Sequence, residues 1–166
     1  MHGPPIFSGC GSELAEYVPL ESLAEDWINR AYRKREEAER QKKSINYDIS
    51  ISASQECIEF SVKAIFLILT GDFQRAHEIK DDEFQKILSS VPKGLEHVDF
   101  ARLWLLNKFW ATFYQLAKYG NEKLMVSAEK LFMQDEADLA YKHADFAYGM
   151  AQNVRYWRLT TPKSAP

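Results

Sequence analysis

The sequence predicts an all-α fold: an antiparallel helical bundle of about five helices, with a four-helix up-and-down core and one short helix. Two observations support this class. Apolar residues recur at the helical period in each predicted element, and glycine, proline and capping residues stand between the elements. No segment alternates apolar and polar residues beside a hairpin turn, as a half-buried strand would. A chain of 166 residues is long enough for one domain with a substantial core.

The chain is predicted to begin with an extended arm over residues 1–19, which contain several glycines and prolines and show no helical period. A first helix follows, and Ser22 and Glu25 have the spacing of a capping box at its start. Its apolar stripe ends near Tyr32, and residues 33–43 are almost all charged. This charged end is either a solvated helix terminus or a basic face that meets RNA or an acidic partner.

The most apolar segment, residues 58–69, is predicted to be the central helix. Its apolar residues fall on almost every side of a helical wheel, so it has little surface to expose to water. A short buried strand has a similar pattern, but this segment continues back without a turn residue, and Gly71 stands where a helix C-cap belongs. Gln55, Glu59 and Lys63 interrupt it at four-residue spacing, which places them on one stripe of the helix.

Two helices are predicted next, one short and one long. Asp81 or Asp82 can cap the short helix, which ends before Pro92. Asp99 can cap the long helix, which is rich in aromatic residues and ends at Gly120. Its aromatic residues cover more than one face, so the helix is either central or part of a subunit interface, where such residues are enriched.

A linker over residues 121–134, with helical turns, is predicted to lead to a last helix from about residue 135 to residue 157. Small residues form a stripe along this helix: Ala137, Ala140, Ala144, Ala147 and Ala151. Because alanine is small, the stripe lets a neighbouring helix approach closely. The predicted bundle thus spans residues 20–158, and residues 159–166 form a tail.

Composition favours a soluble, cytoplasmic protein. The net charge of -3 gives no strongly basic balance that would indicate general nucleic-acid binding. Cys10 and Cys57 match neither a disulfide framework nor a Cys-x-x-Cys pair, which favours a reducing compartment. The start of the chain lacks the pattern of a signal peptide, and the longest apolar run, residues 64–69, is too short to cross a bilayer. We therefore expect no membrane partner.

The central segment resembles a known family. The run from Gln55 to Gly71 contains a Gln, a Glu and a Lys-Ala at four-residue spacing, and His77 and a short helix follow it. This pattern resembles the HEPN domain of prokaryotes, as do the turn at residues 118–120 and the alanine-rich last helix. The resemblance implies a helical bundle that usually dimerises. It also implies one of three roles: ribonuclease in toxin–antitoxin or defence systems, partner of a nucleotidyltransferase, or non-catalytic nucleotide-binding domain.

The family's ribonucleases carry an Arg shortly before a His near the start of the last helix. Between Lys118 and His143 this sequence has no Arg, so it departs from the catalytic pattern. We therefore expect no catalytic residues and a module that binds a nucleotide or a partner protein, with a homodimer as its assembly. Two alternatives stay open: an RNA-cleaving member with a changed active site that recruits His143 or His97, and a purely structural dimerising scaffold.

The stripe of Gln55, Glu59 and Lys63 is the candidate ligand-binding site. A carboxylate and an ammonium within an apolar helix are costly unless they are paired or hydrogen-bonded. One interpretation is an ion pair at the edge of the bundle, with the lysine stem reaching to solvent. The other is a polar cleft in which Lys63 and Lys118 meet a phosphate and an aromatic residue, Tyr119 or Trp104, stacks on a base.

Sites for metals and cofactors are not predicted. Di-iron helical bundles need Glu-x-x-His on inward faces, and none of the 4 histidines has a Glu three positions before it. The sequence also has no P-loop, no Gly-x-Ser-x-Gly and no dinucleotide-binding glycine pattern. His143 is predicted to be a surface or packing residue.

Overall fold

The structure, a computed structural model, describes residues 20–71 and 79–162 of the chain. Within these ranges it contains six α-helices and no β-strand beyond an isolated bridge between Asn121 and Val126. The helices are α1 (Leu20–Lys43), α2 (Tyr47–Thr70), α3 (Asp81–Ser89), α4 (Phe100–Tyr119), α5 (Ala128–Leu131) and α6 (Gln134–Thr160). The predicted all-α class is confirmed, and the additional helix is the short α5 within the predicted linker. The predicted arm at residues 1–19 and His77 lie outside the described residues.

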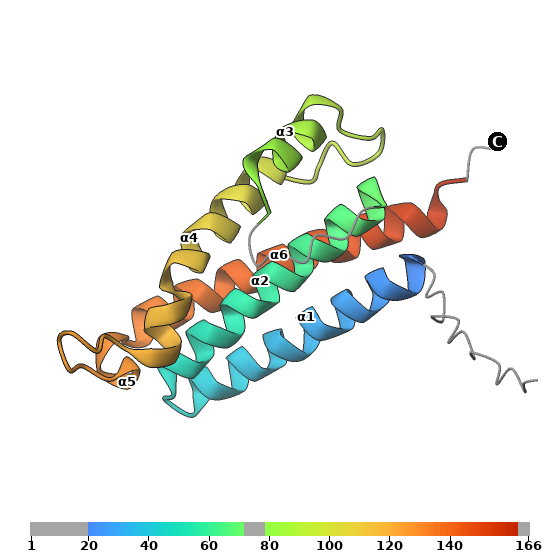
Figure 1. Ribbon diagram of the computed structural model, residues 1–166. Coiled ribbons are helices and arrows are strands. Elements are labelled where there is room, and N and C mark those ends of the chain that lie inside the picture. Colours follow the sequence, from blue (N-terminus) through green and yellow to red (C-terminus); the bar gives the residue numbers. More distant parts are fainter. Residues whose placement is uncertain (1–19, 72–78, 163–166) are drawn as a thin grey trace, which may run out of the picture.

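Three long helices, α1, α2 and α6, pack side by side, and α2 contacts both of the others. A turn of three residues joins α1 to α2, so the two helices run antiparallel. Helix α4 lies on the side of α2 away from α1 and makes few direct contacts with α6, while α3 packs against α4 (Figure 1). Helix α2 is therefore the centre of the bundle, as its sequence predicted.

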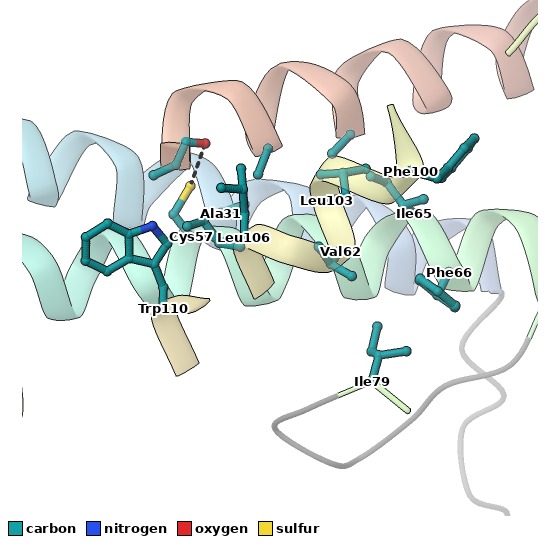
Figure 2. Packing of buried hydrophobic residues seen from close by; sticks show 14 of the residues in the cluster. Ala31, Cys57, Val62, Ile65, Phe66, Ile79, Phe100, Leu103, Leu106 and Trp110 are labelled. Atoms are coloured by element: carbon teal, nitrogen blue, oxygen red, sulfur yellow. Dashed lines mark hydrogen bonds between the residues drawn. The ribbon is translucent and has the colours of Figure 1, made fainter. Parts of the chain in front are cut away.

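The core forms on both sides of α2. Val62 and Ile65 of α2 belong to the larger apolar cluster together with Phe100 and Leu103 of α4 (Figure 2). On the opposite side, Ala64 and Leu67 pack against Trp27 and Ile28 of α1. Helix α2 ends at Gly71, whose φ of 70° lies in the left-handed region and whose N–H donates to the Leu67 carbonyl at 3.0 Å. The predicted C-cap is confirmed.

Of the three predicted helix N-caps, one is confirmed and two are corrected. Asp99 caps α4, because its side chain accepts from the Arg102 N–H at 2.9 Å. The Ser22 capping box is wrong, since α1 begins at Leu20 and Ser22 lies inside its first turn. At α3 the N-cap residue is Lys80. Asp81 instead accepts from the Trp104 indole of α4 at 3.0 Å, a tertiary contact that sequence spacing does not reveal.

Helix α6 packs on α2 through its alanine stripe. All five predicted alanines are fully buried: Ala137, Ala140, Ala144, Ala147 and Ala151. The carbonyl of Ala144 accepts a hydrogen bond from the Cys57 thiol of α2, with 3.7 Å between sulfur and oxygen (Figure 2). Small side chains thus bring the two helix backbones together, as predicted. No helix within the described ranges is long and apolar enough to cross a membrane.

Candidate functional site

The structure brings the three stripe residues of α2 together and buries them. The Lys63 ammonium lies 2.7 Å from Glu59 Oε1, and the Gln55 amide nitrogen donates to Glu59 Oε2 at 3.3 Å. The exposed fractions are 6% for Gln55, 6% for Glu59 and 7% for Lys63. The predicted ion pair is therefore confirmed. The interpretation in which the lysine stem reaches solvent is wrong, because the Lys63 side chain is only 7% exposed.

Helix α1 supplies one wall of this buried pair. The Lys63 Nζ lies 5.2 Å from the centre of the Trp27 ring, and Arg30 stacks on the same ring at 4.8 Å. A cation held between a carboxylate and an aromatic face is stabilised by both. One polar atom of the stripe, Gln55 Oε1, is buried and accepts no hydrogen bond. Most hydrogen-bonding groups of the stripe therefore have partners within the protein, and the Gln55 Oε1 acceptor has none among the described residues.

The other two predicted site residues, Lys118 and Tyr119, stand at the C-terminal end of α4. The Lys118 ammonium donates to the Tyr114 hydroxyl at 2.8 Å, and this hydrogen bond raises the pKa of Lys118. Tyr119 is 61% exposed. No described contact joins either residue to Glu59 or Lys63. The structure therefore does not bring the five predicted residues into one contact network.

Several cations at the charged end of α1 pair with carboxylates of neighbouring helices. Arg35 Nε lies 2.6 Å from Asp145 of α6, and Lys42 Nζ lies 2.9 Å from Asp138 of α6. Lys34 pairs with Glu56 of α2 at 2.6 Å. The sequence left open a solvated terminus or a basic face for RNA or an acidic partner. The described ion pairs instead direct several of these cations toward the neighbouring helices.

A second polar constellation was not found from the sequence. The Trp110 indole of α4 donates to Nδ1 of His143 in α6 at 3.0 Å, and Arg102 Nη2 lies 3.4 Å from His143 Nε2. Burial, followed by the Arg102 and Lys142 charges, lowers the pKa of His143 from its ordinary 6.5. The Arg102 guanidinium also stacks on Phe146 at 5.3 Å. These residues belong to different helices, so no local motif could have indicated them.

Apolar residues surround this constellation on the outer surface of the two helices. We call the set of Leu105, Phe109 and Phe113 on α4 and Leu139 and Phe146 on α6 the α4–α6 aromatic face. Helical spacing of four residues aligns Leu105, Phe109 and Phe113, and the two phenylalanine rings lie 5.2 Å apart. Leu105 is 49% exposed, Phe109 42% and Leu139 43%. Both helices thus present large apolar side chains to solvent.

Two hollows lie elsewhere, at the end of the bundle where α1 begins and α2 and α6 end. Their volumes are about 400 and 380 Å³, and Glu21, Ala24, Ile68 and Arg158 line both. None of the five predicted site residues lines either hollow. Within the described ranges, no group of three or more His, Cys, Asp or Glu side chains could hold a metal ion.

A family model and a solved structure match this chain. The family model for the HEPN domain matches residues 24–154, which is most of the chain. A crystal structure, that of TT1696 from Thermus thermophilus, is similar with a TM-score of 0.62 and 18% sequence identity, over 79% of this chain and 97% of that one. At this identity the likeness shows the fold alone. None of the curated proteins matches.

Proposed function

This chain belongs to the HEPN domain family, and from that premise we propose that it is a binding module that assembles with a partner protein, first with a second copy of itself. The observation that carries this proposal is the α4–α6 aromatic face. Proteins of this family often dimerise. The face offers the surface that such an assembly needs.

The composition of the face supports an interface. Phe109 and Leu105 are nearly half exposed although they are large and apolar. Contiguous apolar patches of this kind typically mark interaction sites, and phenylalanine is enriched in interface cores. Most dimers of identical chains are related by a twofold axis, so that one patch meets the same patch on the second copy. A face built from two neighbouring helices can pack on itself in this way.

The oligomeric state tests the proposal. We expect the protein to sediment as a dimer at micromolar concentration and Leu105→Asp to convert it to a monomer. Leu88→Asp is the matched control, because Leu88 is 48% exposed on α3, outside the face, while Leu105 is 49% exposed. A wild-type protein that stays monomeric at every concentration would refute the proposal. So would a dimer that both Leu105→Asp and Phe109→Asp leave unchanged.

A second candidate partner for this module is a nucleotidyltransferase. The resemblance implies that some family members pair with a nucleotidyltransferase, and such a partner would dock on the same face. Co-expression of the chain with a neighbouring nucleotidyltransferase, followed by affinity purification, tests this pairing. Loss of the complex in Leu105→Asp and its retention in Leu88→Asp would locate the partner on the α4–α6 aromatic face.

A further inference from the structure

The contact between Arg102 and His143 has an unusual composition, because both neighbours of the imidazole are hydrogen-bond donors. The Trp110 indole can only donate, and so can the Arg102 guanidinium. Trp110 Nε1 lies 3.0 Å from Nδ1, and Arg102 Nη2 lies 3.4 Å from Nε2. A neutral histidine has one acceptor nitrogen and one N–H, so it can accept from only one of these two neighbours.

Burial determines from which of the two neighbours the imidazole accepts a hydrogen bond. Trp110 is 3% exposed, so its N–H has little access to water and needs a partner inside the protein. Arg102 is half-buried, and its several other N–H groups can meet solvent. The contact with Trp110 is also the shorter of the two. His143 therefore accepts at Nδ1 and carries its proton on Nε2.

This tautomer leaves two donors side by side. The Nε2–H of His143 and an N–H of Arg102 lie 3.4 Å apart with no acceptor between them. Within residues 20–71 and 79–162, no carboxylate pairs with the Arg102 guanidinium, whose described side-chain contacts are the His143 and Phe146 rings. An oxygen atom placed about 2.8 Å from both nitrogens would complete two hydrogen bonds.

We propose that Arg102 and His143 form a binding site for a phosphate group carried by a nucleotide or by a nucleic-acid backbone. Arginine binds phosphate through parallel N–H groups and retains its charge at every relevant pH. Lys142, the exposed residue next to His143 in the sequence, adds a second positive charge nearby. A phosphate has oxygens enough for the Arg102 and His143 donors. The site differs from the sequence-predicted one at Lys63 and Lys118, and all its residues come from one chain.

The tautomer can be tested on the unmodified protein. Long-range proton–nitrogen NMR spectra of the full chain distinguish the two neutral forms of each histidine. We expect His143 to carry its proton on Nε2 and to shift in a saturable way when inorganic phosphate is added, together with the indole N–H of Trp110. A proton on Nδ1, or no saturable shift at either group, would overturn the proposal.

Two substitutions test whether the N–H groups of Arg102 and His143 bind phosphate. Arg102→Gln should weaken phosphate binding at least tenfold, and His143→Gln should weaken it less, because an amide N–H can replace the imidazole N–H. Arg33→Gln and His97→Gln are the controls, since both residues are exposed and neither has a described contact with Arg102 or His143. If Arg102→Gln unfolds the protein, Arg102→Lys keeps the charge and should still lose the paired geometry. Equal affinity in the Arg102 variant and the Arg33 control would refute a specific site.

Further titrations identify the carrier of the phosphate. Tighter binding of a 5′-mononucleotide than of inorganic phosphate indicates a nucleotide. Tighter binding of a short single-stranded RNA, with affinity that falls steeply with salt, indicates a nucleic-acid backbone. Because Leu105 lies one helical turn from Arg102, this comparison uses the uncharged Leu105→Gln variant, since an aspartate there would itself pair with the guanidinium. Phosphate affinity that Leu105→Gln retains while the dimer is weakened separates this proposal from the proposed dimer.

Discussion

The substitution Glu59→Gln measures how much the buried ion pair of α2 stabilises the fold. It removes one charge and keeps the volume of the side chain. The Lys63 side chain, which is 7% exposed, then lacks its carboxylate partner. Removing one partner of a buried ion pair costs about 3–5 kcal/mol, because the other charge stays buried. Lys63 retains the face of Trp27 at 5.2 Å and gains an amide oxygen as acceptor. We therefore expect a loss of about 2–3 kcal/mol in the free energy of unfolding.

The chain supplies a control with the same chemistry in a different environment. Glu39 and Lys43 form a Glu–Lys pair of the same four-residue spacing on α1, with 2.9 Å between the charged atoms, but Lys43 is 70% exposed. Solvent screens such a pair, so Glu39→Gln should leave the stability of the fold almost unchanged. Chemical denaturation at pH 7 compares the two variants. Thermal unfolding should show a drop of roughly 4–12 °C for Glu59→Gln alone.

A double variant separates the loss of the pair from general damage to the core. When Lys63→Met is added to Glu59→Gln, no unpaired charge remains, and an apolar side chain of similar length fills the space. Replacing a buried ion pair by apolar groups is often close to neutral, so the double variant should be more stable than Glu59→Gln alone. These expectations fail if Glu59→Gln costs no more than Glu39→Gln, or if Lys63→Met adds to the damage.

Individual contacts support four further predictions. Asp99→Ala removes the N-cap of α4 and should lower stability by about 0.5–2 kcal/mol in urea denaturation, whereas Asp99→Asn should retain most of it. The pKa of His143 is lowered in the folded protein, so the unfolded chain binds the proton more tightly, and stability should fall as the pH drops below 6.5 toward the folded pKa. His143→Gln should show a smaller fall over the same pH range in denaturation curves. Burial raises the pKa of the Cys57 thiol to about 12, so mass spectrometry should find it unmodified by a thiol reagent until the protein unfolds. In a thermal scan against nucleotides, a ligand at one hundred times its dissociation constant adds about 2.7 kcal/mol; a shift that survives Arg102→Gln but is lost on substitution of Lys118 would return the site to the sequence-predicted residues.

Much of the fold could be predicted because it depends on local patterns. The apolar run of α2 and the glycine at position 71 determine a buried helix and its end without reference to the rest of the chain. The same holds for the Asp99 cap, whose partner Arg102 is three residues away. Predictions failed where a side chain had a tertiary alternative. Asp81 contacts Trp104 of α4, and a one-dimensional pattern does not contain that partner.

The candidate sites, too, could be predicted only where their geometry is fixed within one helix. Four-residue spacing was enough to place Gln55, Glu59 and Lys63 on one stripe, because a single helix fixes that geometry. Whether the stripe faced solvent or the interior depended on what packs around α2, and the structure buries it, with Trp27 of α1 against the Lys63 ammonium. Lys118 and Tyr119 were joined to the stripe by chemical type alone, and no described contact links them to it.

The sequence by itself therefore determined the helices, most of their ends, the central position of α2 and the resemblance to the HEPN domain, since these follow from residue periodicity and short spacings. Only the tertiary structure decided which polar groups meet. Arg102 and His143 are 41 residues apart and come together because α4 and α6 both pack on α2. The tautomer proposed for His143 rests on the burial of Trp110, and that burial is a property of the packed bundle.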